Sequence, residues 1–245
     1  MQQDIFRDQR AVITGASGGI GKAVALGLGS RGATVCLVGR DAPKLAAVRE
    51  QLLVTCPQTQ SLVCDLGNNQ ETLELSKNIV RTHDRVDMLV HCAGTIALGS
   101  IESAPVAQFE NQYRINALAP ALLTQGLLPL LKKSLGQIVF VNSSVGLRSK
   151  KDAGAYAASK HALHAIADTF RLELNPHGVR VLTVYPGDTA TAMQQTVQSY
   201  TGRHVGAEYL MQPDDVASVI IHALQLPRTA EITDVHMRPF RKAPE

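Results

Sequence analysis

Short apolar runs alternate with longer segments of helical spacing along the whole chain, and this alternation restricts the possible folds more than any other feature. Apolar runs of four to six residues between helices are typical of strands buried on both faces of a parallel sheet. The pattern therefore predicts an α/β fold with helices on both faces of one sheet. The expected strands are Ala11–Thr14, Thr34–Val38, Ser61–Cys64, Val86–His91, Gln137–Val141, Val179–Tyr185 and Glu231–His236.

The chain of 245 residues is long enough for one α/β domain with a full core. No repeat, low-complexity tract or linker divides it, so we expect residues 1–245 to form a single domain. Asp41, followed by Pro43, and Asn68 are of the residue types that begin helices. Residues 188–212 show little periodicity, which predicts a long substrate loop with room for a short helix.

Composition and charge exclude several classes of function. The formal net charge is +3 and there is no basic run, so nucleic acid and anionic membranes are not expected partners. No apolar stretch is long enough to span a membrane, and the first residues lack a signal-peptide core, so we expect a cytoplasmic protein. The four cysteines form no CxxC pair and the histidines are scattered, so we expect free thiols and no metal site.

A glycine-rich turn, TGASGGIG at residues 14–21, follows the first expected strand and leads into a helix. Such a turn brings backbone N–H groups and the positive end of a helix to a pyrophosphate. Tight strand–helix turns need glycine in any case, and the spacing differs from GxGxxG. Because the turn precedes an alternating α/β pattern, it nevertheless favours nucleotide binding. We expect Gly15, Gly19 and Gly21 to matter most, with Gly18 as an extra.

The second expected strand leads to Arg40, where an NAD site usually has an acidic residue for the ribose hydroxyls. A guanidinium suits a 2′-phosphate through paired, charge-assisted hydrogen bonds. The alternative is a solvent-facing arginine, and Asp41 next to it adds an opposing charge. We favour NADP(H) over NAD(H).

Several motifs, taken together in their order, make the sequence resemble the short-chain dehydrogenase/reductase (SDR) family over nearly the whole chain. The resemblance implies a doubly wound, seven-stranded parallel sheet (a Rossmann fold), a nicotinamide cofactor and redox chemistry on a small-molecule carbonyl or secondary alcohol. The motifs are TGASGGIG at 14–21, CDL at 64–66, HCAG at 91–94, Asn116, NSSVG at 142–146, YAASK at 156–160 and YPGDTAT at 185–191.

The resemblance also implies cofactor contacts, residue by residue. It puts Asp65 and Leu66 at the adenine, the HCAG segment along the adenosine, and the backbone near Thr189 at the nicotinamide carboxamide. The implied contacts are Gly15, Ser17, Gly19, Ile20, Gly21, Arg40, Asp65, Leu66, Cys92, Ala93, Gly94, Tyr156, Lys160, Pro186, Gly187, Thr189 and Thr191.

The sequence departs from the family pattern at two places. The family usually has asparagines where His91 and Cys92 stand, so the hydrogen bonds of those amides must be supplied otherwise or lost. Many NADP-preferring members have a basic residue where Gly18 stands, which leaves the phosphate contact to Arg40 with help from Ser17.

Tyr156 and Lys160 are four residues apart and share one face of an expected helix. Taken alone, the pair fits a surface helix. A free phenol has a pKa near ~10, too high for fast proton exchange at neutral pH, and a nearby ammonium favours the phenolate. The resemblance makes Tyr156 the general acid and base, and gives Lys160 a hydrogen bond to the nicotinamide ribose.

Two more residues complete the implied catalytic set. Family spacing selects Ser143, thirteen residues before Tyr156, as a second donor to the carbonyl oxygen, with Ser144 as the fallback. Because proline has no N–H, Pro120 leaves the Asn116 carbonyl without its helical donor. In the family pattern this carbonyl holds a water that relays protons to the lysine; a simple proline kink is the alternative.

The substrate and the physiological direction are left open by the sequence. Arg148 and Arg203 are of a type that binds a carboxylate. The expected pocket residues are Val145, Gly146, Leu147 and residues 188–212, including Met193, Tyr200, Tyr209 and Leu210. One rival function is a non-catalytic, dinucleotide-sensing regulatory protein, against which the complete Asn–Ser–Tyr–Lys set argues. A second is epimerisation or dehydration of a nucleotide sugar, whose enzymes usually have a larger C-terminal part.

We also expect assembly into a homodimer or homotetramer, as in family members. The expected helix Tyr156–Leu174 carries more apolar surface than one sheet face needs, and the leucine-rich segment Leu122–Leu131 adds to it. The apolar residues that carry this prediction are Ala162, Leu163, Ile166 and Phe170.

Overall fold

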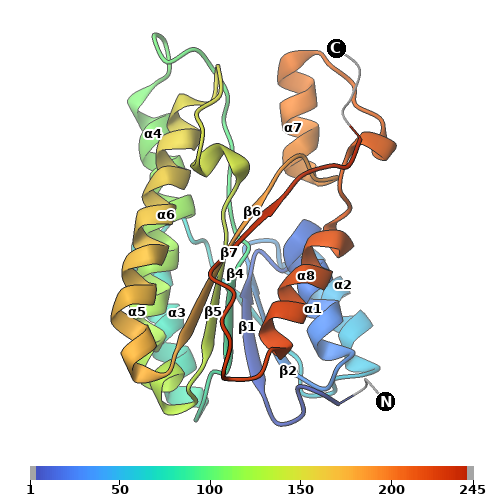
Figure 1. Cartoon of the computed structure of the whole chain (residues 1–245), viewed down its shortest axis with the longest axis vertical. Coiled ribbons are helices and arrows are strands. Elements are labelled where there is room, and N and C mark those ends of the chain that lie inside the picture. The colour runs from blue at the N-terminus through green and yellow to red at the C-terminus, as the bar shows by residue number, and fades with distance from the viewer. Residues whose placement is uncertain (1–3, 242–245) are drawn as a thin grey trace.

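The computed structural model describes residues 4–241, in which the seven expected strands form one parallel sheet. The strands are β1 (Arg10–Thr14), β2 (Thr34–Gly39), β3 (Gln60–Val63), β4 (Met88–His91), β5 (Gln137–Val141), β6 (Arg180–Pro186) and β7 (Asp234–Met237). Their order is β3-β2-β1-β4-β5-β6-β7, so the chain reverses its direction across the sheet beside β1. This is the doubly wound arrangement that was predicted (Figure 1).

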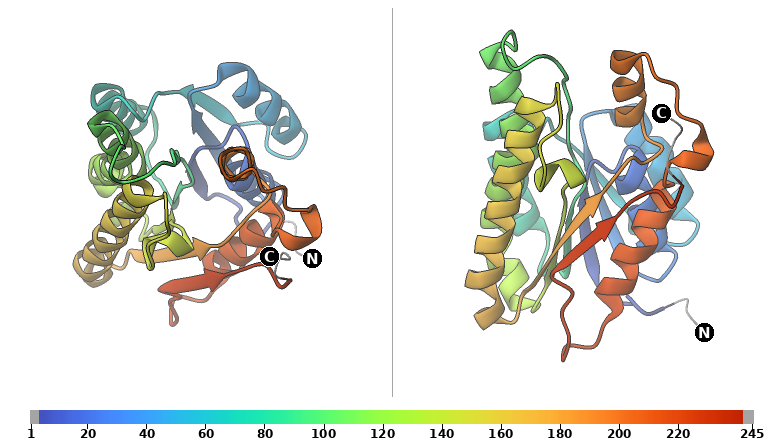
Figure 2. Two further views of the ribbon diagram at one scale, coloured as in Figure 1. Left: turned by 90° about the horizontal axis from the view of Figure 1, so that it is seen from above. Right: turned by 45° about the horizontal axis from the view of Figure 1, so that its top comes forward.

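Helices cover both faces of the sheet, as Figures 1 and 2 show. On one face lie α1 (Gly19–Gly29), α2 (Ala42–Leu53) and α8 (Pro213–Gln225). On the other lie α3 (Asn69–Thr82), α5 (Ala119–Lys133) and α6 (Gly154–Leu174), with α4 (Val106–Tyr113) packed on α6. The short elements are the π-helical η1 (Arg114–Leu118) and the 3-10 turns η2 (Ser144–Gly146), η3 (Asn175–His177) and η4 (Ala207–Tyr209).

The continuous apolar runs are explained by two separate cores. Val12 and Ile13 are neighbours on β1, yet Val12 packs into the core under α3, α5 and α6 and Ile13 into the core under α1, α2 and α8. Both side chains are fully buried because successive strand residues point to opposite faces and both faces are covered. A strand that is buried on both sides needs no polar face, which is why the runs lack alternation.

The two expected helix starts are confirmed. The Asp41 carboxylate accepts a hydrogen bond from the Lys44 amide at 3.0 Å, and Asn68 accepts from the amides of Gln70 and Glu71. Each cap satisfies N–H groups that the first turn of a helix leaves without an intrahelical partner.

The last strand begins three residues later than predicted, at Asp234, and a side chain is the reason. The Glu231 carboxylate accepts from the Val181 amide at 2.8 Å, taking the place of a strand carbonyl. Regular pairing with β6 starts only after this point, from Thr183 opposite Asp234.

The expected loop 188–212 contains α7 (Ala192–Thr201) and η4, and no residue of α7 is buried. An amphipathic helix without a buried face is weakly held, which suits a lid. Within residues 4–241, no helix is both long enough and apolar enough to cross a bilayer.

The prediction of assembly assumed free apolar surface on α6, and this assumption was wrong for two of the four residues named. Leu163 and Phe170 face the sheet and are buried within the chain itself, so they add no free apolar surface. Ala162 and Ile166 are partly buried against the same core. A homodimer or homotetramer stays a prediction.

Candidate active site

A cleft of about 860 Å³ lies at the carboxyl ends of the strands, where the direction of the sheet order reverses. This is the position at which open α/β sheets bind their ligands. Its wall contains every expected catalytic and cofactor-binding residue but one, Asn116. The expected residues in the wall are Gly15, Ser17, Gly19, Ile20, Gly21, Arg40, Asp65, Leu66, Cys92, Ala93, Gly94, Ser143, Tyr156, Lys160, Pro186, Gly187, Thr189 and Thr191.

The glycine turn is built for close approach of backbone to backbone. Gly15 has φ +66°, and a Cβ on it would lie 2.7 Å from the Ala93 amide nitrogen; a Cβ on Gly21 would collide with the Gly15 carbonyl oxygen. Ser17 and Gly18 lie in the cleft wall at the start of α1, and their amides have no acceptor in the described part of the chain. Free N–H groups at a helix N-terminus fit a pyrophosphate.

Two cations lie at the far end of the cleft from Tyr156. Arg40 follows β2, and Lys44 lies in the first turn of α2; both are exposed and line the wall. The Lys44 ammonium is 2.9 Å from the Asp41 carboxylate and, with its hydrogen bonds, lowers the pKa of that carboxyl. Sequence reasoning missed Lys44, whose signal was its position three residues after a helix cap.

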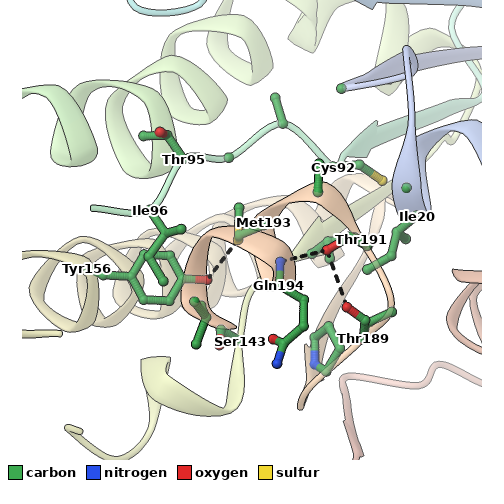
Figure 3. A pocket seen from close by; sticks show the side chains of 18 of the residues that line it. Ile20, Cys92, Thr95, Ile96, Ser143, Tyr156, Thr189, Thr191, Met193 and Gln194 are labelled. Atoms are coloured by element: carbon green, nitrogen blue, oxygen red, sulfur yellow. Dashed lines mark hydrogen bonds between the residues drawn. The ribbon is translucent and has the colours of Figure 1, made fainter. Parts of the chain in front are cut away.

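Tyr156 lies in the first turn of α6 with its ring against Ile96 and its hydroxyl toward the centre of the cleft (Figure 3). The residue is only 5% exposed. Its hydroxyl donates to the Met193 sulfur of α7 at 3.9 Å. Burial raises the pKa of Tyr156, and the neighbouring Ser143 hydroxyl opposes the rise.

The nearby ammonium was expected to lower the pKa of Tyr156, but in this structure the pKa is raised. Lys160 is 3% exposed, and its ammonium donates to the Val141 carbonyl at 3.0 Å. Burial lowers the pKa of Lys160 to about 8. For each group the loss of water sets the direction of the shift, because desolvation penalises its charged form.

Ser143 and Ser144 both lie in the cleft wall, and the choice of Ser143 as the second donor stays a prediction. Ser143 is half-buried, and its hydroxyl accepts from the Val145 amide at 3.2 Å as well as meeting the Tyr156 hydroxyl. Ser144 begins η2 and is exposed. The neighbouring Asn142, which was not singled out, donates to the Lys160 carbonyl at 3.0 Å and so ties β5 to α6.

Asn116 is fully buried in the π-helical turn before α5 and lies behind the cleft wall. Its side-chain oxygen accepts from the Thr95 amide at 2.8 Å, and its nitrogen donates to the Thr95 carbonyl and to Ser159. These bonds fix the segment after β4 against α6. Ala119 donates to the Arg114 carbonyl, five residues back, in this wider turn next to Pro120. The water relay stays a prediction.

The two departures from asparagine have different consequences. His91 is buried, its Nε2 lies 2.9 Å from the Thr124 hydroxyl, and its ring stacks on Phe140. Burial lowers the pKa of His91 to about 3, so the ring is neutral. Cys92 lines the cleft, and burial raises the pKa of its thiol to about 12, so it stays protonated.

The substrate end of the cleft was predicted only in part. Val145, Met193 and Tyr200 line it, whereas Gly146, Leu147, Arg148, Arg203, Tyr209 and Leu210 lie outside its wall. The side chains that sequence reasoning missed come mainly from the segment after β4 and from the turn before α6. They are Thr95, Ile96, Leu98, Ile115, Lys150, Lys151, Asp152 and Arg238.

Comparison with known proteins agrees with this geometry. Residues 9–201 match the model of the short chain dehydrogenase family. An uncharacterized oxidoreductase of Staphylococcus saprophyticus is 31% identical over 236 residues, which are 96% of this chain and 98% of the relative.

Two solved structures are similar over nearly their full length. An alcohol dehydrogenase of the archaeon Thermococcus sibiricus, complexed with 5-hydroxy-NADP, has a TM-score of 0.87 at 26% identity and covers 97% of this chain and 99% of its own. A metagenomic short-chain oxidoreductase in complex with NADP has a TM-score of 0.84 at 31% identity. It covers 98% of this chain and 100% of its own.

Proposed function

Because this chain belongs to the short chain dehydrogenase family of oxidoreductases, we propose that it transfers a hydride between NADP(H) and a carbonyl compound or secondary alcohol. One observation carries the proposal. A single cleft has the glycine turn and the cations Arg40 and Lys44 at one end, and the Tyr156 hydroxyl beside Ser143 at the other. The NADP complexes of similar proteins support the choice of cofactor.

The cofactor has a fitting site in these residues. The unpaired amides of Ser17 and Gly18 suit the pyrophosphate, and Arg40 with Lys44 suits a 2′-phosphate. Asp65 borders the adenosine end, and Thr189 and Thr191 lie in the wall beside α7. When bound, the nicotinamide supplies or accepts the hydride at the carbonyl carbon.

The chain's own residues handle the proton. Because burial keeps the Tyr156 phenol protonated at neutral pH, Tyr156 donates to the carbonyl oxygen during reduction. The Ser143 hydroxyl donates to the same oxygen and stabilises the negative charge that develops there. Lys160, held by the Val141 carbonyl, places a positive charge in the cleft wall and stabilises the phenolate that forms when Tyr156 gives up its proton.

A carbonyl panel with NADPH tests the proposed function. We expect NADPH oxidation with at least some ketones or aldehydes, and the reverse reaction with the matching alcohols. The control is the chain without carbonyl, which reports NADPH loss by other routes. Tight NADPH binding with no turnover across a broad panel in either direction would instead favour the dinucleotide-sensing protein.

A further inference from the structure

Two adjacent lysines, Lys150 and Lys151, line the cleft on the turn between η2 and α6. Both are exposed, and within residues 4–241 neither ammonium has a hydrogen-bond or ion-pair partner. The proposed reaction uses neither of them. They concentrate two positive charges on one short turn beside the reacting centre.

This turn holds a fixed position relative to the catalytic residues. At its start the Arg148 amide donates to the Ser144 carbonyl, next to Ser143. At its end Ala153 donates to the Lys150 carbonyl and pairs with Gly99 in an isolated parallel bridge, and α6 begins directly afterwards. These bonds keep the backbone that carries the two lysines in place relative to Ser143 and the start of α6.

Apolar side chains form part of the wall around the Tyr156 hydroxyl, beside the polar Ser143. Figure 3 shows Ile96 and Met193 beside the tyrosine ring and hydroxyl. Val145 and Leu98 lie in the same wall. A carbonyl flanked by a hydrocarbon chain fits this part of the cleft, because the chain replaces water against apolar side chains.

Charges elsewhere in the wall do not cancel the lysines. The acidic residues in that part of the cleft are Asp152 and Asp188, and neither forms an ion pair with Lys150 or Lys151 among the described residues. Arg238, after β7, adds another cation to the wall. An anionic group of a substrate meets a net positive charge here.

Resting on the proposed function, we infer that the substrate is an anionic ketone: an apolar segment carries the carbonyl to Tyr156, and a carboxylate at its other end pairs with Lys150 and Lys151. The sequence alone suggested Arg148 and Arg203 for a carboxylate, but neither lies in the wall.

The test compares methyl ketones that end in a carboxylate with their methyl esters, in chain lengths from short to medium, at fixed NADPH. For the best chain length we expect kcat/KM to favour the acid about two- to fivefold, the range for exposed ion pairs. In the Lys150→Ala/Lys151→Ala variant the acid-to-ester ratio of kcat/KM should fall to about one. In the parent protein, high salt should reduce the same ratio, because it screens exposed charges.

Two controls separate a local effect from a change in overall charge. Lys77→Ala/Arg81→Ala removes the same two charges from the exposed face of α3, away from the cleft, and should keep the parent ratio. Lys150→Arg/Lys151→Arg keeps the charges and should keep most of the preference. An acid-to-ester ratio near one in the parent, or one that survives in the double alanine variant, overturns the inference.

Calorimetric binding of the keto acid separates this inference from the proposed function. Binding that is lost in Lys150→Ala/Lys151→Ala and kept in Lys77→Ala/Arg81→Ala supports the anion site even if no carbonyl is reduced. Reduction of the ester with equal affinity for acid and ester overturns the anion site alone.

Discussion

Replacing Arg40 by alanine should weaken NADPH binding selectively. Arg40 is exposed in the cleft wall, and no ion pair occupies its guanidinium among the described residues, so it is available to a 2′-phosphate. A charge-assisted hydrogen bond contributes about 1.5–3 kcal/mol, and solvent at this exposed position reduces that to about 1–2 kcal/mol. We therefore expect Kd for NADPH to rise about five- to thirtyfold.

Lys44 should contribute less than Arg40, because its ammonium already pairs with Asp41 at 2.9 Å. The assay is a fluorescence titration of NADPH and NADH at fixed ionic strength, since exposed charges are screened by salt. NADH has no 2′-phosphate, so its Kd should change little in Arg40→Ala, and Arg40→Asp should reverse the preference. Equal losses for both cofactors would refute the assignment and give Arg40 a structural role only.

Three further predictions follow from other parts of the cleft. Gly18→Arg should tighten NADPH binding, measured by the same titration, because Gly18 is extended at φ −178° and a Cβ there meets no atom within 4 Å. For reduction, kcat/KM should fall as pH rises through about 8, where the Lys160 ammonium loses its proton, and a flat alkaline limb would contradict this role. Asn116→Ala leaves the main chain of Thr95 without partners, so urea unfolding should show a loss of about 2–4 kcal/mol; a loss below about 0.5 kcal/mol would contradict it.

The sequence predicted the sheet well because its signals are local. An apolar run such as that ending in Ile13 and Thr14 is buried wherever helices cover both faces, and the caps Asp41 and Asn68 act within one helical turn. The boundary at Glu231 could not be predicted, since it depends on a carboxylate that reaches the Val181 amide across the sheet.

In the candidate site, motif residues were found and residues without a motif were missed. Lys44, Lys150 and Lys151 belong to no recognisable pattern, and only the fold brings them to one cleft. For Asn116 a role was predicted only for the main-chain carbonyl, and the bonds of its side chain to the main chain of Thr95, 21 residues earlier in the sequence, were not foreseen. Such pairings depend on tertiary packing, which neither spacing nor periodicity reports.

The raised pKa of Tyr156 shows a further limit of prediction from sequence spacing. Spacing correctly places Lys160 one turn away on α6, but the balance between attraction and desolvation depends on how deeply both are buried. Tyr156 and Lys160 are 5% and 3% exposed, so burial decides the direction.

Turnover of Tyr156→Phe with NADPH and the best carbonyl of the panel tests the central claim most directly. The substitution removes the hydroxyl that meets Ser143 and leaves the buried ring in place. We predict that kcat falls by at least about two orders of magnitude, the scale of general-acid catalysis, while the Kd for NADPH stays within about twofold of the parent. Near-normal kcat in this variant, with NADPH binding intact, would contradict the assignment of Tyr156 as the proton donor.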